Sequence, residues 1–317
     1  MKILFMGTPD FARVSLEALI ASRHEIVGVV TRQDKPTGRH HVLTAPPVKE
    51  CALENDIEVL QPQTLRTDEF MDTLREKYPD LDLIVVVAYG RILPLSVLEY
   101  PKYGCINLHG SLLPKYRGAA PMQRAVMAGE EKVGVTVMRM ADGVDTGNMI
   151  RKSSVDLPED ADFEFVHDTL ALIGSKLLVE VVDEIEEKEN ALTEEVQDDS
   201  LATYAEKIEN SDCELDFSKT AREIHDTVRG LCPVPYAFTT LKGKKLKVAK
   251  TALIKSDKRV NALPGAVVSI DGGVITVSCA GGEMIAITRV LPEGKRLMDA
   301  SDFIRGRGVD VGDILGR

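Results

Sequence analysis

The segment "INLHGSLLP" (106–114) places an amide and an imidazole two residues apart, at the end of a run that otherwise reads as a buried strand. Because alternate residues of a strand point to the same face, Asn107 and His109 should lie side by side. An amide N–H can bind a developing oxyanion and an imidazole can move a proton, which are the two requirements of acyl transfer. The alternative is that both side chains only satisfy backbone groups at a strand end.

A second polar cluster, "MADGVDTG" (140–147), places Asp142, Asp145 and Thr146 among glycines, directly after another predicted strand. A carboxylate close to His109 would fix the orientation and tautomer of its ring. The alternative is an ordinary tight turn, since Asp-Gly is among the strongest turn signals. Each motif is weak by itself.

Alternating strands and helices precede and follow these motifs. The patterns predict strands at 2–7, 25–31, 82–90 and 105–109, an antiparallel pair at 134–140 and 148–155, and helices at 11–22 and 164–187. This order is typical of an open, mostly parallel α/β sheet of the Rossmann-like kind. Ligands of such sheets bind outside the carboxyl ends of the strands, which is where Asn107 and His109 fall.

The last third of the chain has a different pattern. After a predicted helix at 221–231, short β-rich runs alternate with glycine-rich turns up to residue 291, which favours a small antiparallel β-barrel of the OB-like kind. The preceding segment 183–200 holds nine acidic residues and one lysine. We therefore predict a catalytic domain at 1–189, an acidic linker at 190–206 and a barrel domain at 207–317, as expected for a chain of 317 residues.

Charge is distributed unevenly between these parts. The net charge is −11, but residues 207–317 carry 18 basic and 14 acidic side chains, whereas the first 206 residues carry 21 and 36. Within the barrel domain, residues 242–259 contain eight basic residues and one acidic residue. Such a stripe is suited to a phosphate backbone. A solvated lysine-rich hairpin is the alternative.

Several classes of protein are disfavoured by composition. The chain shows no apolar run of signal-peptide or membrane-spanning length, and its five cysteines are scattered, so we expect a protein of the reducing cytoplasm. The first strand is followed by "GTPDF" (7–11) and not by GxGxxG, so a nicotinamide cofactor is not indicated. No cluster of His, Cys and carboxylate residues has metal-ligand spacing, so we expect no metal.

In combination, the motifs resemble a known family. "NLHGSLLPKYRGAAP" (107–121) followed by "DGVDTG" (142–147) is similar to the motifs of the folate-dependent formyltransferases. The opening "MKILFMGTPDFA" (1–12) and "RGAAPMQRAV" (117–126) narrow the resemblance to members of that family that act on methionyl-tRNA. With "YAEKI" (204–208) and "RGLCPVPYA" (229–237), the resemblance covers essentially the whole chain.

The resemblance implies transfer of a formyl group from 10-formyltetrahydrofolate, a co-substrate, to the amino group of methionyl initiator tRNA, giving formylmethionyl-tRNA for translation initiation. Asn107, His109 and Asp145 match the family's catalytic trio. Asn107 and a protonated His109 would stabilise the tetrahedral oxyanion, while Asp145 holds His109 and helps to move the proton. The residues that match the folate site are Ser111, Leu112, Leu113, Pro114, Tyr89, Gly90 and Asp142.

Two segments match the tRNA contacts implied by the family. One is the loop 32–47, in which Arg39 is the candidate residue for the acceptor stem. Here His40-His41 replaces the glycine and basic residues of the usual pattern, so we expect this loop's contribution to be weaker or more pH-sensitive. The other is the basic stripe, with Lys242, Lys244, Lys245 and Lys247 as candidates and Arg305 and Arg307 as additions. We expect a monomer.

Two rival functions are weighed against this one. A formyltransferase acting on a glycinamide nucleotide or an amino sugar, or a folate hydrolase, would share the trio but would not explain the basic barrel, "GTPDFA" or "RGAAP". A non-catalytic RNA-binding protein is disfavoured because Asn107, His109 and Asp145 are all present.

Overall fold

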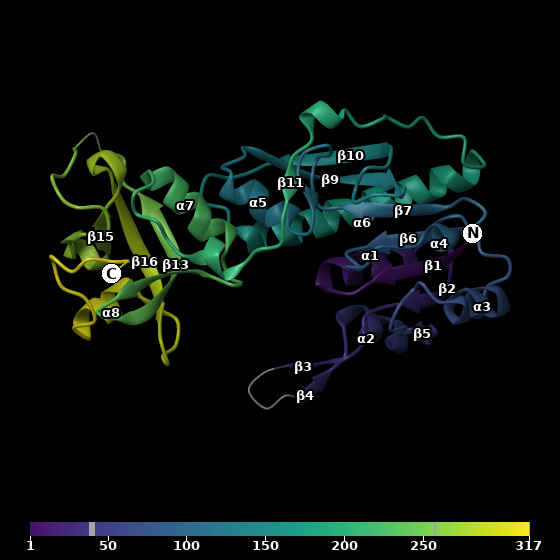
Figure 1. The fold of residues 1–317 in the computed structure, drawn as a ribbon, viewed down its shortest axis with the longest axis horizontal. Coiled ribbons are helices and arrows are strands. Elements are labelled where there is room, and N and C mark those ends of the chain that lie inside the picture. Colours follow the sequence, from purple (N-terminus) through teal and green to yellow (C-terminus); the bar gives the residue numbers. More distant parts are fainter. Residues whose placement is uncertain (38–41, 257, 317) are drawn as a thin grey trace. The chain divides into compact units, whose positions relative to one another are not determined.

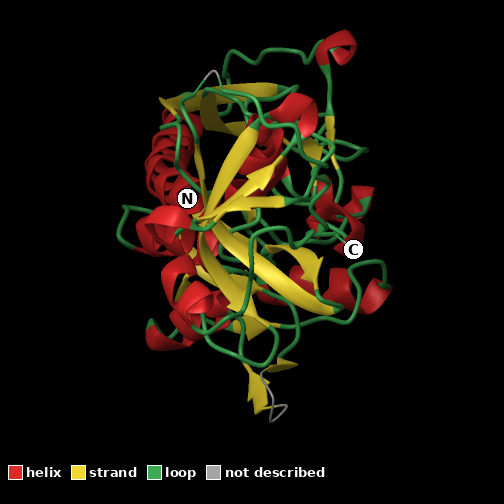
Figure 2. Ribbon diagram, turned by 90° about the vertical axis from the view of Figure 1, so that its left-hand side faces the viewer, coloured by secondary structure: helices red, strands yellow, loops and turns green. Residues whose placement is uncertain are grey.

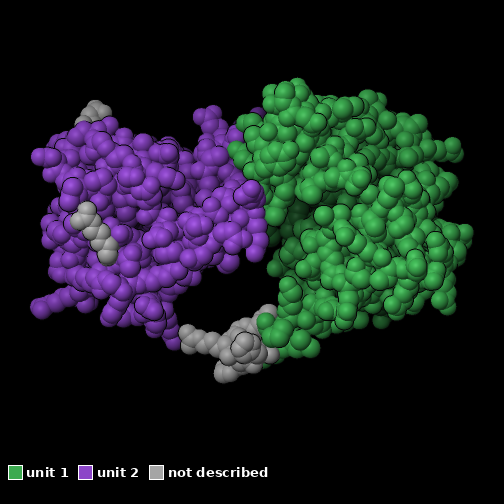
Figure 3. All heavy atoms as spheres, viewed as in Figure 1, with its two compact units in different colours: residues 1–121, 133–155, 167–205 green, residues 122–132, 156–166, 206–317 purple. Residues whose placement is uncertain are grey.

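The computed structural model describes residues 1–37, 42–256 and 258–316, and their contacts divide the chain into two compact units (Figure 3). Unit 1 contains Met1–Pro121, Val133–Val155 and His167–Ala205, and unit 2 contains Met122–Lys132, Asp156–Val166 and the described residues from Glu206 onward. This division differs from the three consecutive segments expected from the sequence. Residues 190–205 belong to unit 1, and two short stretches of the expected catalytic domain, 122–132 and 156–166, belong to unit 2.

The sheet of unit 1 has seven strands in the order β10-β9-β7-β6-β1-β2-β5 (Figure 1). Their bounds are β1 Lys2–Gly7, β2 Glu25–Val30, β5 Val59–Leu60, β6 Leu83–Val87, β7 Cys105–His109, β9 Lys132–Arg139 and β10 Met149–Asp156. The five strands from β7 to β5 run parallel, and β9 is antiparallel to β7. The predicted open, mostly parallel α/β sheet is therefore confirmed.

Burial explains why the central strands are continuous apolar runs. All five residues of β6 and all but the first of β1 are buried, as expected for parallel strands covered on both faces. The sequence pattern extended the β6 strand to residue 90, but β6 ends at Val87 because Ala88 and Gly90 have φ values of +46° and +75°. A left-handed residue turns the chain out of the sheet at its carboxyl edge.

Helices connect these strands (Figure 2). Their bounds are α1 Asp10–Ile20, α2 Pro47–Glu54, α3 Asp68–Lys77, α4 Leu95–Leu98, α5 Pro121–Met127 and α6 Phe163–Glu187. The long helix predicted at 164–187 is confirmed as α6. Its acidic end holds the start of the chain, because Glu186 Oε1 lies 2.8 Å from the amino group of Met1.

Two short strand pairs lie outside the large sheet. Strands β3 (Lys35–Thr37) and β4 (Val42–Thr44) form an antiparallel pair. Strands β8 (Arg117–Gly118) and β11 (Tyr204–Ala205) form a parallel pair. The second pair attaches the end of the acidic segment to unit 1, and Gln197 and Ala205 are buried there. Their burial explains why residues 190–205 are not a free connector.

Unit 2 is built on an antiparallel sheet in the order β12-β13-β16-β15-β14, with β17 beside β16. Its elements are η2 Asn210–Cys213, α7 Ala221–Gly230, β12 Ala237–Leu241, β13 Lys244–Leu253, β14 Val267–Ser269, η3 Asp271–Gly273, β15 Ile275–Ser278, η4 Ala280–Gly282, β16 Met284–Pro292, β17 Met298–Asp299 and α8 Ala300–Arg305; η1 (Asp199–Leu201) belongs to unit 1.

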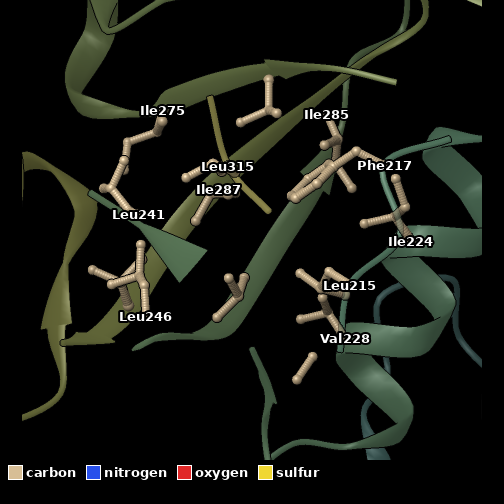
Figure 4. Close-up of a cluster of buried hydrophobic side chains, with 14 of the residues drawn as sticks. Leu215, Phe217, Ile224, Val228, Leu241, Leu246, Ile275, Ile285, Ile287 and Leu315 are labelled. Atoms are coloured by element: carbon tan, nitrogen blue, oxygen red, sulfur yellow. The ribbon is translucent and has the colours of Figure 1, made fainter. Parts of the chain in front are cut away.

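The sheet of unit 2 curls into a half-barrel around one apolar core. Ile224 and Val228 of α7 pack there with Leu246, Ile285 and other buried residues of the sheet (Figure 4). The last residues of the chain bind both edges of the sheet, since Leu315 N–H donates to Gly265 O and Gly316 N–H donates to Thr240 O. The predicted small antiparallel barrel domain is confirmed in this form.

No helix in the described part of the chain is long and apolar enough to cross a membrane. The five cysteines are free, and four of them are buried. Among the residues that the structure describes, no group of three or more His, Cys, Asp or Glu side chains is arranged to hold a metal ion.

Candidate active site

Strand β7 presents the amide and the imidazole at its carboxyl end, between β6 and β9. Asn107 is half-buried and His109 is 5% exposed. The Asn107 side chain makes no hydrogen bond with the described residues, so its amide group remains available to a ligand. A half-buried amide without a protein partner is costly unless a ligand or solvent binds it. This favours a binding role over the satisfaction of backbone groups.

Both ring nitrogens of His109 are directed by neighbouring groups. Nε2 lies 2.9 Å from the carbonyl oxygen of Tyr116, and because a carbonyl oxygen only accepts, Nε2 carries the hydrogen. Nδ1 therefore faces the Asp145 carboxylate, whose Oδ2 is 3.6 Å away. That distance permits a charge interaction but exceeds a hydrogen bond. The atom of the ring that can exchange a proton is thus the one beside Asp145.

Asp145 is held in an unusual backbone conformation. Its φ is +53°, in the left-handed region that few side chains adopt. The backbone N–H of Gly118 donates to its Oδ2 at 2.8 Å, and the Gln197 side chain donates to its carbonyl oxygen at 2.8 Å. The chain bends through residues 142–145, and the strained residue of this bend is the one that approaches His109. Such strain is characteristic of functional sites.

The loop after β7 is rigidly attached to β9. The Ser111 hydroxyl donates to Lys115 O, Thr136 Oγ1 accepts from Leu113 N and donates to Ser111 O, and Leu113–Pro114 is a cis peptide. Ser111 and Leu113 are buried, and Leu112 packs beside Gly134. The polar groups of Ser111 and Leu113 are thus engaged within the protein, so this loop offers a shaped surface more than free hydrogen-bonding groups.

The remaining candidates for the folate site lie in different surroundings. The Tyr89 side chain is 2% exposed within an apolar core cluster, and burial raises the pKa of its hydroxyl. Only the backbone of Tyr89 is therefore available as a contact. Gly90 has open space where a side chain would stand. Asp142 is exposed in the turn that leads to Asp145.

The lysines of the basic stripe are not equivalent. Lys242 is bound by Asp310 and Asp313 at 2.9 and 2.8 Å, so its charge is neutralised. Lys245 lies over the ring of Phe238, and Lys247 lies over Tyr236 and donates to Pro235 O. Lys244 is exposed. Lys242 is thus the lysine of this group least able to bind a further anion.

Arg39, His40 and His41 lie outside the described residues, so the tRNA contact expected there stays a prediction.

Three residues that hold Asp145 in place were not predicted from the sequence. Gly118 and Gln197 bind Asp145 directly, and Arg117 binds Gln197. Arg117 Nε donates to Gln197 Oε1, and the Gln197 amide donates to the backbone of the 145–147 turn. Gln197 stands in the run "EEVQDDS" (194–200), whose charge is typical of a solvated segment. No periodic pattern marks it as buried, because one neutral amide among carboxylates gives no local signal of burial.

Both parts of the chain match models of known protein families. Residues 1–182 match the model of the family described as formyl transferase, and residues 207–308 match the formyl transferase C-terminal domain. A methionyl-tRNA formyltransferase of Acetivibrio thermocellus is 43% identical over 317 residues, covering 100% of both chains. One from Bacillus subtilis is 43% identical over 315 residues, covering 99% of this chain and 98% of that one.

A solved N-formyltransferase from Helicobacter canadensis, in complex with folinic acid and dTDP-3-aminofucose, has a TM-score of 0.67. The two chains are 20% identical, and the match covers 90% of this chain and 98% of the Helicobacter canadensis chain. At this identity the match shows similarity of fold alone. The two matched family models and the full-length relatives show membership of a family as well as a fold. On these grounds, this chain belongs to the formyl transferase family.

Proposed function

We propose that this chain transfers the formyl group of 10-formyltetrahydrofolate to the amino group of methionyl initiator tRNA, giving formylmethionyl-tRNA and tetrahydrofolate. The observation that carries the proposal is the trio at the end of β7, where His109 Nδ1 faces Asp145 beside the unpartnered amide of Asn107. The full-length relatives that are named methionyl-tRNA formyltransferases support the choice of acceptor.

The chemistry assigned to the trio follows from its atoms. The methionine amine attacks the formyl carbon, a C–N bond forms, and the formyl oxygen becomes a tetrahedral oxyanion. The Asn107 amide donates to that oxygen, and so does the Nδ1–H of His109 once its ring is protonated. The C–N10 bond of the folate then breaks. One proton passes from the attacking amine to N10 through His109 and Asp145, so charge and atoms balance.

The folate is assigned to the surface beside this trio. The rigid loop Ser111–Pro114 and the backbone at Tyr89 and Gly90 line the position of the pterin. Asp142, exposed at the end of its turn, is a further contact in this proposal. The open space at Gly90 supports a close approach by a ring, since a side chain there would occupy it.

The tRNA is assigned to the described lysines of the basic stripe and to Arg39. Lys244, Lys245 and Lys247 hold phosphates without reading bases. Lys242 contributes less, because two carboxylates already neutralise it. In this proposal residues 1–189 supply the side chains that contact the reacting groups, and residues 207–317 bind the tRNA. The protein acts as a monomer in the cytoplasm, where its free cysteines stay reduced.

A competition between acceptors tests this function. The protein is mixed with 10-formyltetrahydrofolate labelled in the formyl carbon, in the presence of methionyl initiator tRNA and of a dTDP-amino sugar at equal concentration. We expect label in formylmethionine released from the tRNA and none in the sugar. Label in the sugar alone, or release of formate without either product, would contradict the proposed acceptor.

A further inference from the structure

Both polar groups of the Gln197 side chain, the amide nitrogen and the amide oxygen, are hydrogen-bonded within the protein. It is 7% exposed, and its amide nitrogen donates to the carbonyl oxygens of Asp145 and Gly147, each at 2.8 Å. Its oxygen accepts from Arg117 Nε at 2.9 Å. A buried amide bonded on both sides costs free energy to move, because any displacement leaves at least one buried group unsatisfied. The backbone on either side of Thr146 is thereby fixed.

Arg117 fixes Gln197 in turn. Its side chain is 3% exposed, and its Nη2 donates to Asp199 Oδ1 at 2.7 Å. Its backbone N–H donates to Thr203 O, within the pairing of β8 with β11. The guanidinium is planar and presents its donors in a fixed geometry, so Nε is directed at Gln197 while Nη2 is directed at Asp199.

The next residue of β8 completes the support. Gly118 N–H donates to Asp145 Oδ2 at 2.8 Å, on the same carboxylate oxygen that faces His109 Nδ1. Asp145 is therefore held at two points: its carboxylate by the backbone of β8, and its carbonyl oxygen by Gln197. Two anchors are what a residue at φ +53° requires, since such a conformation persists only when its surroundings impose it.

We infer that Gln197, oriented by Arg117, is a positioning residue for Asp145 that sets the distance between its carboxylate and His109; the inference rests on the proposed role of Asp145 in formyl transfer. The segment 194–205 therefore belongs to the support of Asp145. Gln197 touches neither substrate, and its effect is on the rate of the chemical step.

The test compares Gln197→Met, which has neither donor nor acceptor, with Gln197→Glu, which keeps the bond to Arg117 but loses the amide donors. Because small misplacements of a catalytic group are expensive, both should lower kcat about 10- to 100-fold. The KM values for 10-formyltetrahydrofolate and for methionyl-tRNA should stay unchanged. Should the methionine variant fail to fold, the glutamate variant retains the buried partner of Arg117 and carries the test.

A matched control separates positioning from general attachment of the segment. Asn148 Nδ2 donates to Glu194 Oε2, so Asn148→Ala loosens the same segment without removing a bond to Asp145. This variant should keep its kcat. An equal loss of kcat in Asn148→Ala and Gln197→Glu would overturn the positioning role.

A double-mutant cycle with Asp145→Asn tests whether Gln197 acts through Asp145. If Gln197 acts through Asp145, the two substitutions together should cost little more than Asp145→Asn alone. Additive losses would overturn the inference and leave the proposed function standing. A fully active Asp145→Asn variant would overturn both, because the residue that Gln197 positions would then have no part in the reaction.

Discussion

His109 has both ring nitrogens assigned by its neighbours, which separates it from a histidine that merely ends a strand. Tyr116 O fixes the proton on Nε2, and Nδ1 is left beside Asp145. Asn107, two residues earlier on β7, has no such partner among the described residues. The orientation of the His109 imidazole is therefore fixed by the protein, whereas the Asn107 amide is available to bind a ligand.

Asn107→Ala should lower kcat about 10²- to 10³-fold, because it removes one donor to the oxyanion. Binding of 10-formyltetrahydrofolate should change little, since the Asn107 amide donates its hydrogen bond mainly in the transition state. Single-turnover formylation, with folate binding measured separately, checks this.

Ser111→Ala is the comparison for Asn107→Ala. The Ser111 hydroxyl already donates to Lys115 O, so its loss should affect folate binding or stability more than kcat. A loss of kcat in Ser111→Ala as large as in Asn107→Ala would show that the oxyanion role has been assigned to the wrong group.

The pairing of β8 with β11 depends on a glycine at 118. Its φ is +119°, and a Cβ built there would meet Ala205 O at 2.8 Å. Gly118→Ala should therefore separate the two strands and displace the N–H that binds Asp145. We expect a loss of stability of about 1–3 kcal/mol, as for other strained residues, together with reduced kcat. Thermal unfolding and formylation rates measure the two effects.

Gly272→Ala is the matched control for Gly118→Ala. Its φ is +65°, but a side chain there would meet no atom within 4 Å. It should show the cost of the left-handed conformation without loss of kcat. Full activity in Gly118→Ala would contradict the role assigned to the β8–β11 pair.

The hairpin of β12 and β13 should set the salt dependence of tRNA binding. Removing one phosphate contact should lower the magnitude of the slope of log affinity against log salt by about 0.7–0.9. Lys244→Ala should show this change, whereas Lys242→Ala should show less, because Asp310 and Asp313 neutralise Lys242. Filter binding across a salt series measures both slopes. Equal slopes for wild type and Lys244→Ala would contradict a phosphate contact at Lys244.

Stability of the complete chain should fall in mild acid. Burial lowers the pKa of His225, whose Nδ1 lies 2.9 Å from Thr251 Oγ1, and burial likewise lowers the pKa of His24. Below the ordinary histidine pKa of about 6.5, the unfolded chain takes up protons that the folded chain does not. The free energy of unfolding is thus fully present above that pH and decreases as the pH falls.

His225→Asn should reduce this decrease, because asparagine places a polar atom near the position of Nδ1 but does not titrate. Adding His24→Asn should reduce it further. Chemical denaturation at a series of pH values between about 5 and 8, the range in which histidine titrates, measures the effect. A pH dependence identical to that of wild type in the double variant would contradict the assignment to these two histidines.

The fold could be predicted where periodicity is strong. The buried run of β6, the strand β7 and the helix α6 carry patterns that allow few other structures. Asn107, His109 and Asp145 could be singled out because polar residues at strand ends are chemically conspicuous. The structure then places the Asp145 carboxylate 3.6 Å from His109.

The support behind Asp145 could not be predicted. Strands β8 and β11 have two residues each, too few for any period, and they pair across more than eighty residues of sequence. The segment around Gln197 is acidic, and local charge indicates solvation even where one side chain is buried. Long-range hydrogen bonds decide its place, and those are visible only in three dimensions.

Single-turnover formylation by wild type and by His109→Ala tests the proposed mechanism most directly. Enzyme in excess is mixed with 10-formyltetrahydrofolate and methionyl initiator tRNA, and formylmethionyl-tRNA is followed in time. Wild type should formylate the tRNA, and His109→Ala should bind the tRNA equally but react at least about 10²-fold more slowly, the scale of a lost general acid–base. Near-normal turnover by His109→Ala, or no formylated tRNA from wild type, would contradict it.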